Sequence, residues 1–177
     1  SYNTALRFEG VTIPPGAQID SAVLSFHPTN EVDSSVRLLL NVYAEAAADS
    51  APYDPTNYDE GRPDQRSRTE AFIDRWVIRC NSSCTDDTEY DCPQRQKDCW
   101  DREVRYEVPK DLAALLQEVV DTEGWQEGNA VSIFLFNAAG QGETADWTGS
   151  RNITGYDEEK GEDYVPRLEV TWQRVEE

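Results

Sequence analysis

Apolar and polar residues alternate with a period of two along most of the chain, which is the pattern of β-strands that bury one face. The run 36–43 is apolar on both faces, so we expect it to form a central strand. The other predicted strands cover residues 6–8, 22–26, 72–78, 104–108, 131–136 and 168–172, with a weaker one at 145–148.

One segment has a helical period instead. Pro109 lies near its first turn and Gly124 lies just past its end, positions that are typical of helix boundaries. Between them, apolar residues recur at three- and four-residue spacing at Leu112, Leu115, Leu116, Val119 and Val120. The sequence therefore predicts a mainly β protein, an antiparallel β-sandwich of jelly-roll type, with one short amphipathic helix that closes one end or side of it.

Length and charge narrow the class of protein. A chain of 177 residues fits one domain, residues 1–177, with a core of ordinary size. Its 16 basic residues against 35 acidic ones give a net charge of −19, which disfavours nucleic acid and anionic lipid surfaces as partners. No stretch approaches the roughly 20 apolar residues of a membrane helix, so direct membrane insertion is not expected. Cations and neutral sugars remain compatible partners.

Four cysteines fall within a polar segment, residues 80–101, that we interpret as an insertion in the domain. They are Cys80, Cys84, Cys92 and Cys99. A loop of this composition favours two disulfides as staples, and the spacing lacks the paired C-x2-C motifs of zinc ribbons, although a metal site stays open. Nesting Cys84–Cys92 inside Cys80–Cys99 suits a local hairpin, but all three pairings remain possible on sequence.

Two glycosylation sequons accompany the cysteines, at Asn81 and Asn152. Sequons and disulfides together predict a secreted, extracellular glycoprotein with covalent N-glycans. The chain contains no Met and opens in Ser1-Tyr2-Asn3 directly before an apolar run, from which we expect a processed piece of a longer precursor.

Acidic and aromatic residues supply candidate binding sites. A structural Ca²⁺ is the best metal hypothesis, with Glu45, Asp49 and Asp54 as ligands, because carboxylates crowd this segment; the alternative is a solvated acidic surface. Loop aromatics that could stack on sugar rings are Tyr53, Tyr58, Trp100 and Trp147, with packing as the alternative.

No constellation of catalytic residues is apparent. The single histidine, His27, sits in a strand run, and no nucleophile elbow is present. We therefore expect His27 to be structural or solvent-facing and the protein not to be an enzyme.

The segment ALRFEGVTIPPGAQIDSAVLSF resembles the opening of secreted β-sandwich modules of the DNRLRE-like or carbohydrate-binding-module-like type. The similarity continues in three further segments, NVYAEAAADSAPY, DLAALLQEVVDTEGWQEGNAVSIFLF and VPRLEVTW. The strand around Trp76 also resembles the central Trp-bearing strand of these modules. The cysteine segment departs from the resemblance. The resemblance implies an extracellular, mostly non-catalytic module and transfers no catalytic residue.

The same resemblance implies one further strand upstream, which this chain begins too late to supply. The gap could be filled by a neighbouring copy, as in donor-strand complementation, or by the same precursor. We accordingly predict a non-enzymatic, glycosylated structural subunit of a filament or surface layer whose partners are copies of itself. The alternative is a Ca²⁺-assisted carbohydrate-binding module of a larger secreted protein, with polysaccharide as its partner.

Overall fold

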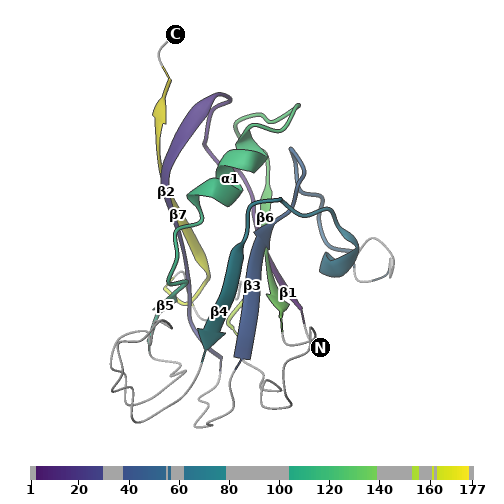
Figure 1. Cartoon of the computed structure of the whole chain (residues 1–177), viewed down its shortest axis with the longest axis vertical. Helices are drawn as coiled ribbons and strands as arrows, with labels where there is room; N and C mark the ends of the chain where they lie inside the picture. The colour runs from purple at the N-terminus through teal and green to yellow at the C-terminus, as the bar shows by residue number, and fades with distance from the viewer. Residues whose placement is uncertain are drawn as a thin grey trace.

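The computed structural model of the protein contains two antiparallel sheets and one short helix in the part of the chain that it describes (Figure 1). The described residues are 3–29, 38–54, 56, 62–78, 104–138, 153–155, 161 and 163–175. The four-stranded sheet has the order β1-β6-β3-β4, with β1 at Thr4–Phe8, β6 at Val131–Asn137, β3 at Leu38–Ala44 and β4 at Ile73–Ile78. The three-stranded sheet has the order β5-β2-β7, with β5 at Tyr106–Glu107, β2 at Ala17–Phe26 and β7 at Arg167–Arg174. A 3-10 turn, η1, covers Pro63–Gln65. The predicted mainly β fold with a single short helix is confirmed.

The four-stranded sheet is organised around β3, which pairs with β6 on one side and with β4 on the other. Its inward residues, Leu40 and Val42, are buried in the core, and its outward Leu39 is fully buried as well. The prediction of a central strand here is confirmed, because a strand that is apolar on both faces needs cover on both. By contrast, Trp76 lies on β4, at the edge of the described sheet rather than in a central strand.

The three-stranded sheet is built on β2, the longest strand, which pairs with β7 from Ala17↔Arg174 to Ser25↔Arg167. A register shift between Ile19 and Ser21 marks a β-bulge in this ladder. The strand expected at 104–108 is reduced to the two residues of β5, Tyr106–Glu107. The weaker strand expected at 145–148 lies outside the described residues.

The helix α1, Ala113–Val120, is shorter at its start than the pattern predicts. Its first turn is lost because the Leu112 amide donates to the carbonyl of Ala22 on β2, 2.8 Å away. The helix then buries the apolar side predicted for it, Leu115, Leu116, Val119 and Val120. Past its end, Gly124 takes a φ of 92°, a left-handed conformation that glycine adopts without steric cost.

The core lies between the sheets and beneath the helix. Phe26 of β2 meets Trp76 of β4 with ring centroids 6.0 Å apart. Trp125 follows the helix, is 4% exposed, and donates its indole N–H to the carbonyl of Ile13 at 3.0 Å. Both tryptophans therefore pack in the core.

Candidate functional site

One edge of the three-stranded sheet, the side of β2 away from β7, is closed by a succession of different groups. Near the end of β2, β5 pairs with Ser25 and Phe26. The amide of Val108 then donates to the carbonyl of Leu24 at 2.9 Å. The amide of Leu112 donates to the carbonyl of Ala22 at 2.8 Å. We call this the capped edge.

Side chains complete the capped edge where no further backbone reaches it. Asp111 accepts a hydrogen bond from the amide of Ala22 at 2.8 Å. Gln117 of the helix accepts from the amide of Ile19 at 2.8 Å and donates to the carbonyl of Ala17 at 3.1 Å. Its amide group thus replaces one residue of a neighbouring strand beside the bulge, where regular pairing is interrupted.

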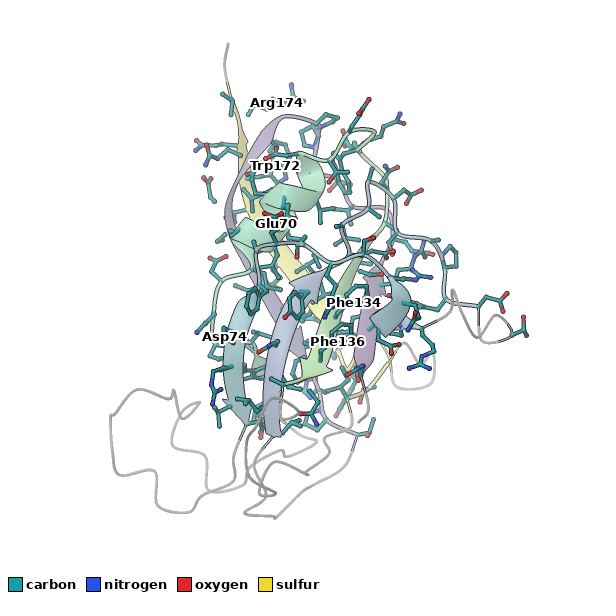
Figure 2. All side chains as sticks on the ribbon, turned by 45° about the vertical axis from the view of Figure 1, so that its right-hand side comes forward. Glu70, Asp74, Phe134, Phe136, Trp172 and Arg174 are labelled. Carbon is teal, nitrogen blue, oxygen red and sulfur yellow. The ribbon has the colours of Figure 1, made fainter. Side chains whose placement is uncertain are left out.

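The opposite edge of the same sheet is the outer side of β7, and no described strand pairs with it. We call it the open edge. The inward residues of β7 are Leu168, Val170 and Trp172; they pack against the core but stay partly exposed. Figure 2 shows Trp172 and Arg174 following β7 toward the end of the sandwich where the helix lies.

Cover over the core is also thin at β1, the terminal strand of the other sheet. All five residues of β1 are only half-buried, including the core-facing Leu6 and Phe8. The inward residues of the internal strands, such as Ile133 and Val42, are fully buried. Among the described strands, the partly exposed apolar side chains that pack against the core lie on β1 and β7; the others, such as Val11 and Ile153, lie outside the strands.

The sequence of β7 leaves its edge usable as a template for pairing. Its eight residues contain no proline, which would remove a backbone donor. Glu169 and Arg174 are exposed along it, and charges of this kind discourage indiscriminate pairing.

The carboxylates expected to bind Ca²⁺ have separate roles in the structure. Glu45 is buried and meets the Arg66 guanidinium at 3.2 Å and the Ser50 hydroxyl at 2.5 Å. Asp49 accepts from the amide of Ala130 at 2.9 Å, and Asp54 accepts from the amide of Thr56 at 2.8 Å. Among the residues that the structure describes, no three His, Cys, Asp or Glu side chains form a group that could hold a metal ion. Calcium binding stays a prediction.

Glu45 instead belongs to a buried polar cluster that the sequence patterns did not reveal. Ser50 lies 2.6 Å from Ser132 of β6, so the cluster ties the segment after β3 to the outward side of the four-stranded sheet. Arg66 lies over the ring of Tyr53, 4.1 Å from its centroid. The only sequence signal was an acidic residue directly after a buried strand, which is too common to identify a cluster.

Tyr53, a predicted sugar-stacking residue, has one ring face covered by Arg66. Its hydroxyl is buried and makes no hydrogen bond within the described residues, although Ser132 lies close enough to influence it. Burial raises the pKa of Tyr53, and Ser132 and the positive charge of Arg66 oppose that rise. The neutral phenol is therefore the form that the fold favours.

His27 is 9% exposed and packs against Tyr164, with ring centroids 4.8 Å apart, as expected for a structural residue. Several other predicted site residues lie outside the described part of the chain. They are Cys80, Cys84, Cys92, Cys99, Asn81, Asn152, Tyr58, Trp100 and Trp147. Disulfides, glycans and sugar contacts at these positions stay predictions.

The geometry defines a two-sheet, mainly β protein whose three-stranded sheet has one capped edge and one edge, at β7, that no described strand pairs with. No known protein-family profile matches the chain. No curated protein matches it either. Within the described residues, no helix has the length and apolar character needed to cross a membrane.

Proposed function

We propose that this protein is a non-enzymatic structural module, a glycosylated subunit of an extracellular filament or surface layer that assembles through strand complementation between subunits. The open edge of β7 carries the proposal. A β-strand with unpaired backbone groups and half-buried apolar residues offers both hydrogen bonds and apolar surface to an added strand.

The added strand comes from a second copy and lies beside β7. Its backbone pairs with the open edge, and its inward side chains extend the apolar row of Leu168, Val170 and Trp172. Such a contact joins two different surfaces of identical subunits, so its repetition produces a fibre unless the rotation closes a ring.

The remaining predicted features fit a secreted assembly of this kind. N-glycans on Asn81 and Asn152, with the net charge of −19, keep the outer surface hydrated and limit lateral clumping. Disulfides among Cys80, Cys84, Cys92 and Cys99 hold the 80–101 insertion, and a Ca²⁺ ion at the acidic segment adds rigidity. The sandwich is of the jelly-roll type, in line with the resemblance to secreted DNRLRE-like modules.

The test compares assembly of two lysine variants by sedimentation and negative-stain electron microscopy. Val170→Lys puts a charge on the inward, half-buried side of β7, whereas Thr171→Lys puts the same charge on its exposed side. We expect the wild type and Thr171→Lys to form polymers as concentration rises, and Val170→Lys to remain monomeric and folded. A wild type that stays monomeric at high concentration, or a Val170→Lys variant that polymerises normally, contradicts the proposal.

A further inference from the structure

Aromatic side chains gather on the outward side of the four-stranded sheet, away from the core. Phe134 and Phe136 of β6 stack with centroids 5.4 Å apart, and Tyr43 of β3 lies 5.9 Å from Phe136. Phe72, just before β4, stacks on Tyr43 at 4.9 Å and is 43% exposed. In Figure 2, Phe134 and Phe136 lie on β6, and Glu70 and Asp74 lie toward the side of the sheet where β4 runs.

Arg68 lies over this aromatic cluster. Its guanidinium carbon is 5.1 Å from the ring centroid of Tyr43 and 5.3 Å from that of Phe136. The residue is exposed, and it forms no ion pair with any carboxylate in the described part of the chain. A guanidinium that rests its face on aromatic rings keeps its N–H groups available to a ligand in the ring plane. We call Tyr43, Arg68 and Phe72 the aromatic platform.

The backbone beneath the platform is held from two sides. Thr69 is 3% exposed, and its hydroxyl lies within hydrogen-bond distance of the amide of Ala44, at 3.1 Å, and of the carbonyl of Ala71, at 2.8 Å. Glu118 of the helix accepts from the amides of Glu70 and Ala71 at 2.8 and 3.0 Å. Phe72 is therefore presented by an anchored segment, so a ligand would find the ring already in place, at low entropic cost.

Local strain adjoins the platform. Arg75 of β4 has a φ of 55°, the only positive φ among the described non-glycine residues. The pairing of β3 with β4 is irregular between Leu40 and Val42, and the side chain of Asn41 accepts the amide of Arg75 at 3.0 Å. Bulges and left-handed non-glycine residues concentrate beside functional sites, because folding alone gives no reason to keep them.

We propose that the aromatic platform binds neutral pyranose units of a polysaccharide. The exposed Phe72 ring offers an apolar face for the C–H side of a sugar, and Arg68 offers hydrogen-bond donors to hydroxyls. Glu70 and Asp74, both exposed, flank Phe72 along the chain with acceptors. A surface of mixed donors and acceptors around an aromatic ring suits uncharged polyols, and these carboxylates, with the net charge of −19, disfavour acidic glycans.

This site is distinct from the predicted sugar-stacking residues Tyr53, Tyr58, Trp100 and Trp147, and it does not depend on the open edge of β7. The platform lies on the four-stranded sheet, whereas β7 belongs to the other sheet. Loss of one function by mutation therefore leaves the other measurable.

The experiment measures binding of the whole chain to immobilised laminarin, hydroxyethylcellulose and glucomannan, with alginate as an acidic comparison, by biolayer interferometry. The variant is Phe72→Ala, and the matched control is Val175→Ala, which truncates the other exposed large apolar side chain of the described residues, 62% exposed and directly after β7. Phe72→Trp serves as the conservative replacement.

We expect at least one neutral polysaccharide to bind. Phe72→Ala should weaken this binding by roughly tenfold or more, the effect of removing a central aromatic contact, while Val175→Ala and Phe72→Trp bind as the wild type does. Binding to none of the neutral polysaccharides, binding to alginate alone, or equal binding by Phe72→Ala overturns the proposal.

Discussion

The two edges of the three-stranded sheet are finished in opposite ways. On the capped edge, successive groups from β5, Val108, Asp111, Leu112 and Gln117 satisfy the backbone of β2. On the open edge, β7 ends the sheet with no described partner, and its inward residues keep part of their surface exposed.

This difference shows that the fold can close an edge where closure is useful. A ten-residue strand is sealed along its length on one side, by a two-residue strand and by the segment that leads into α1. No comparable group caps β7 among the described residues, although an exposed edge invites unwanted pairing. The open edge is therefore the surface on which the proposed strand complementation depends.

The strongest effect is expected from the helix that seals the capped edge. Leu116→Ala removes a side chain that is 1% exposed, and we expect the free energy of unfolding to fall by about 2–5 kcal/mol. Glu123→Ala, at an exposed position just past the helix, should change it by less than about 0.5 kcal/mol. Urea denaturation of the monomer measures the free energy of unfolding of both variants. Similar free energies for the two would show that the packing of α1 contributes little to stability.

A smaller loss is expected where a side chain caps the backbone. Asp111→Ala leaves the amides of Ala22 and Ala113 without their acceptor and should lower the free energy of unfolding by about 1–3 kcal/mol. Glu127→Ala truncates an exposed carboxylate outside the capped edge and is the matched control. Equal stabilities of the two variants, by thermal and urea unfolding, would remove Asp111 from the capped edge.

The amide of Gln117 gives a more specific test of strand mimicry. Gln117→Leu removes both the acceptor for the Ile19 amide and the donor to the Ala17 carbonyl, so we expect a cost of about 1 kcal/mol. Hydrogen exchange should then speed up at the start of β2 while β7 is unaffected. An unchanged exchange rate of the Ile19 amide would show that the Gln117 side chain does not protect the backbone of β2.

The smallest effect at neutral pH is expected at Tyr53, which lies away from both edges. Because burial raises the pKa of Tyr53 in the folded state, stability should be intact below the ordinary tyrosine pKa of about 10 and should fall as pH rises above it. Tyr53→Phe should change the free energy of unfolding by less than about 1 kcal/mol at pH 7 and should weaken that alkaline loss. Identical pH profiles for the two proteins would contradict the assignment.

Strand positions and the helix could be predicted from the sequence because their signals are local. The alternation around Leu24 and Phe26 and the helical spacing from Leu112 to Val120 depend only on which side of an element faces the core. The start of α1 was wrong by one turn, since the Leu112 amide pairs with a strand that lies far away in sequence.

The polar contacts could not be predicted in the same way. The pairing of Gln117 with Ala17 and Ile19 joins residues about 100 positions apart, and the stacking of Phe72 on Tyr43 depends on the register of β3 against β4. The expected role of Glu45 as a calcium ligand rested on the density of nearby carboxylates. The structure shows that this side chain binds Arg66, a choice that composition alone does not encode.

Cryo-electron microscopy of the native assembled material tests the open edge most directly. The account predicts regular filaments in which a strand of one subunit is hydrogen-bonded along β7 of the next and covers Leu168, Val170 and Trp172. Dispersed particles, or filaments in which the outer side of β7 faces solvent, would contradict it.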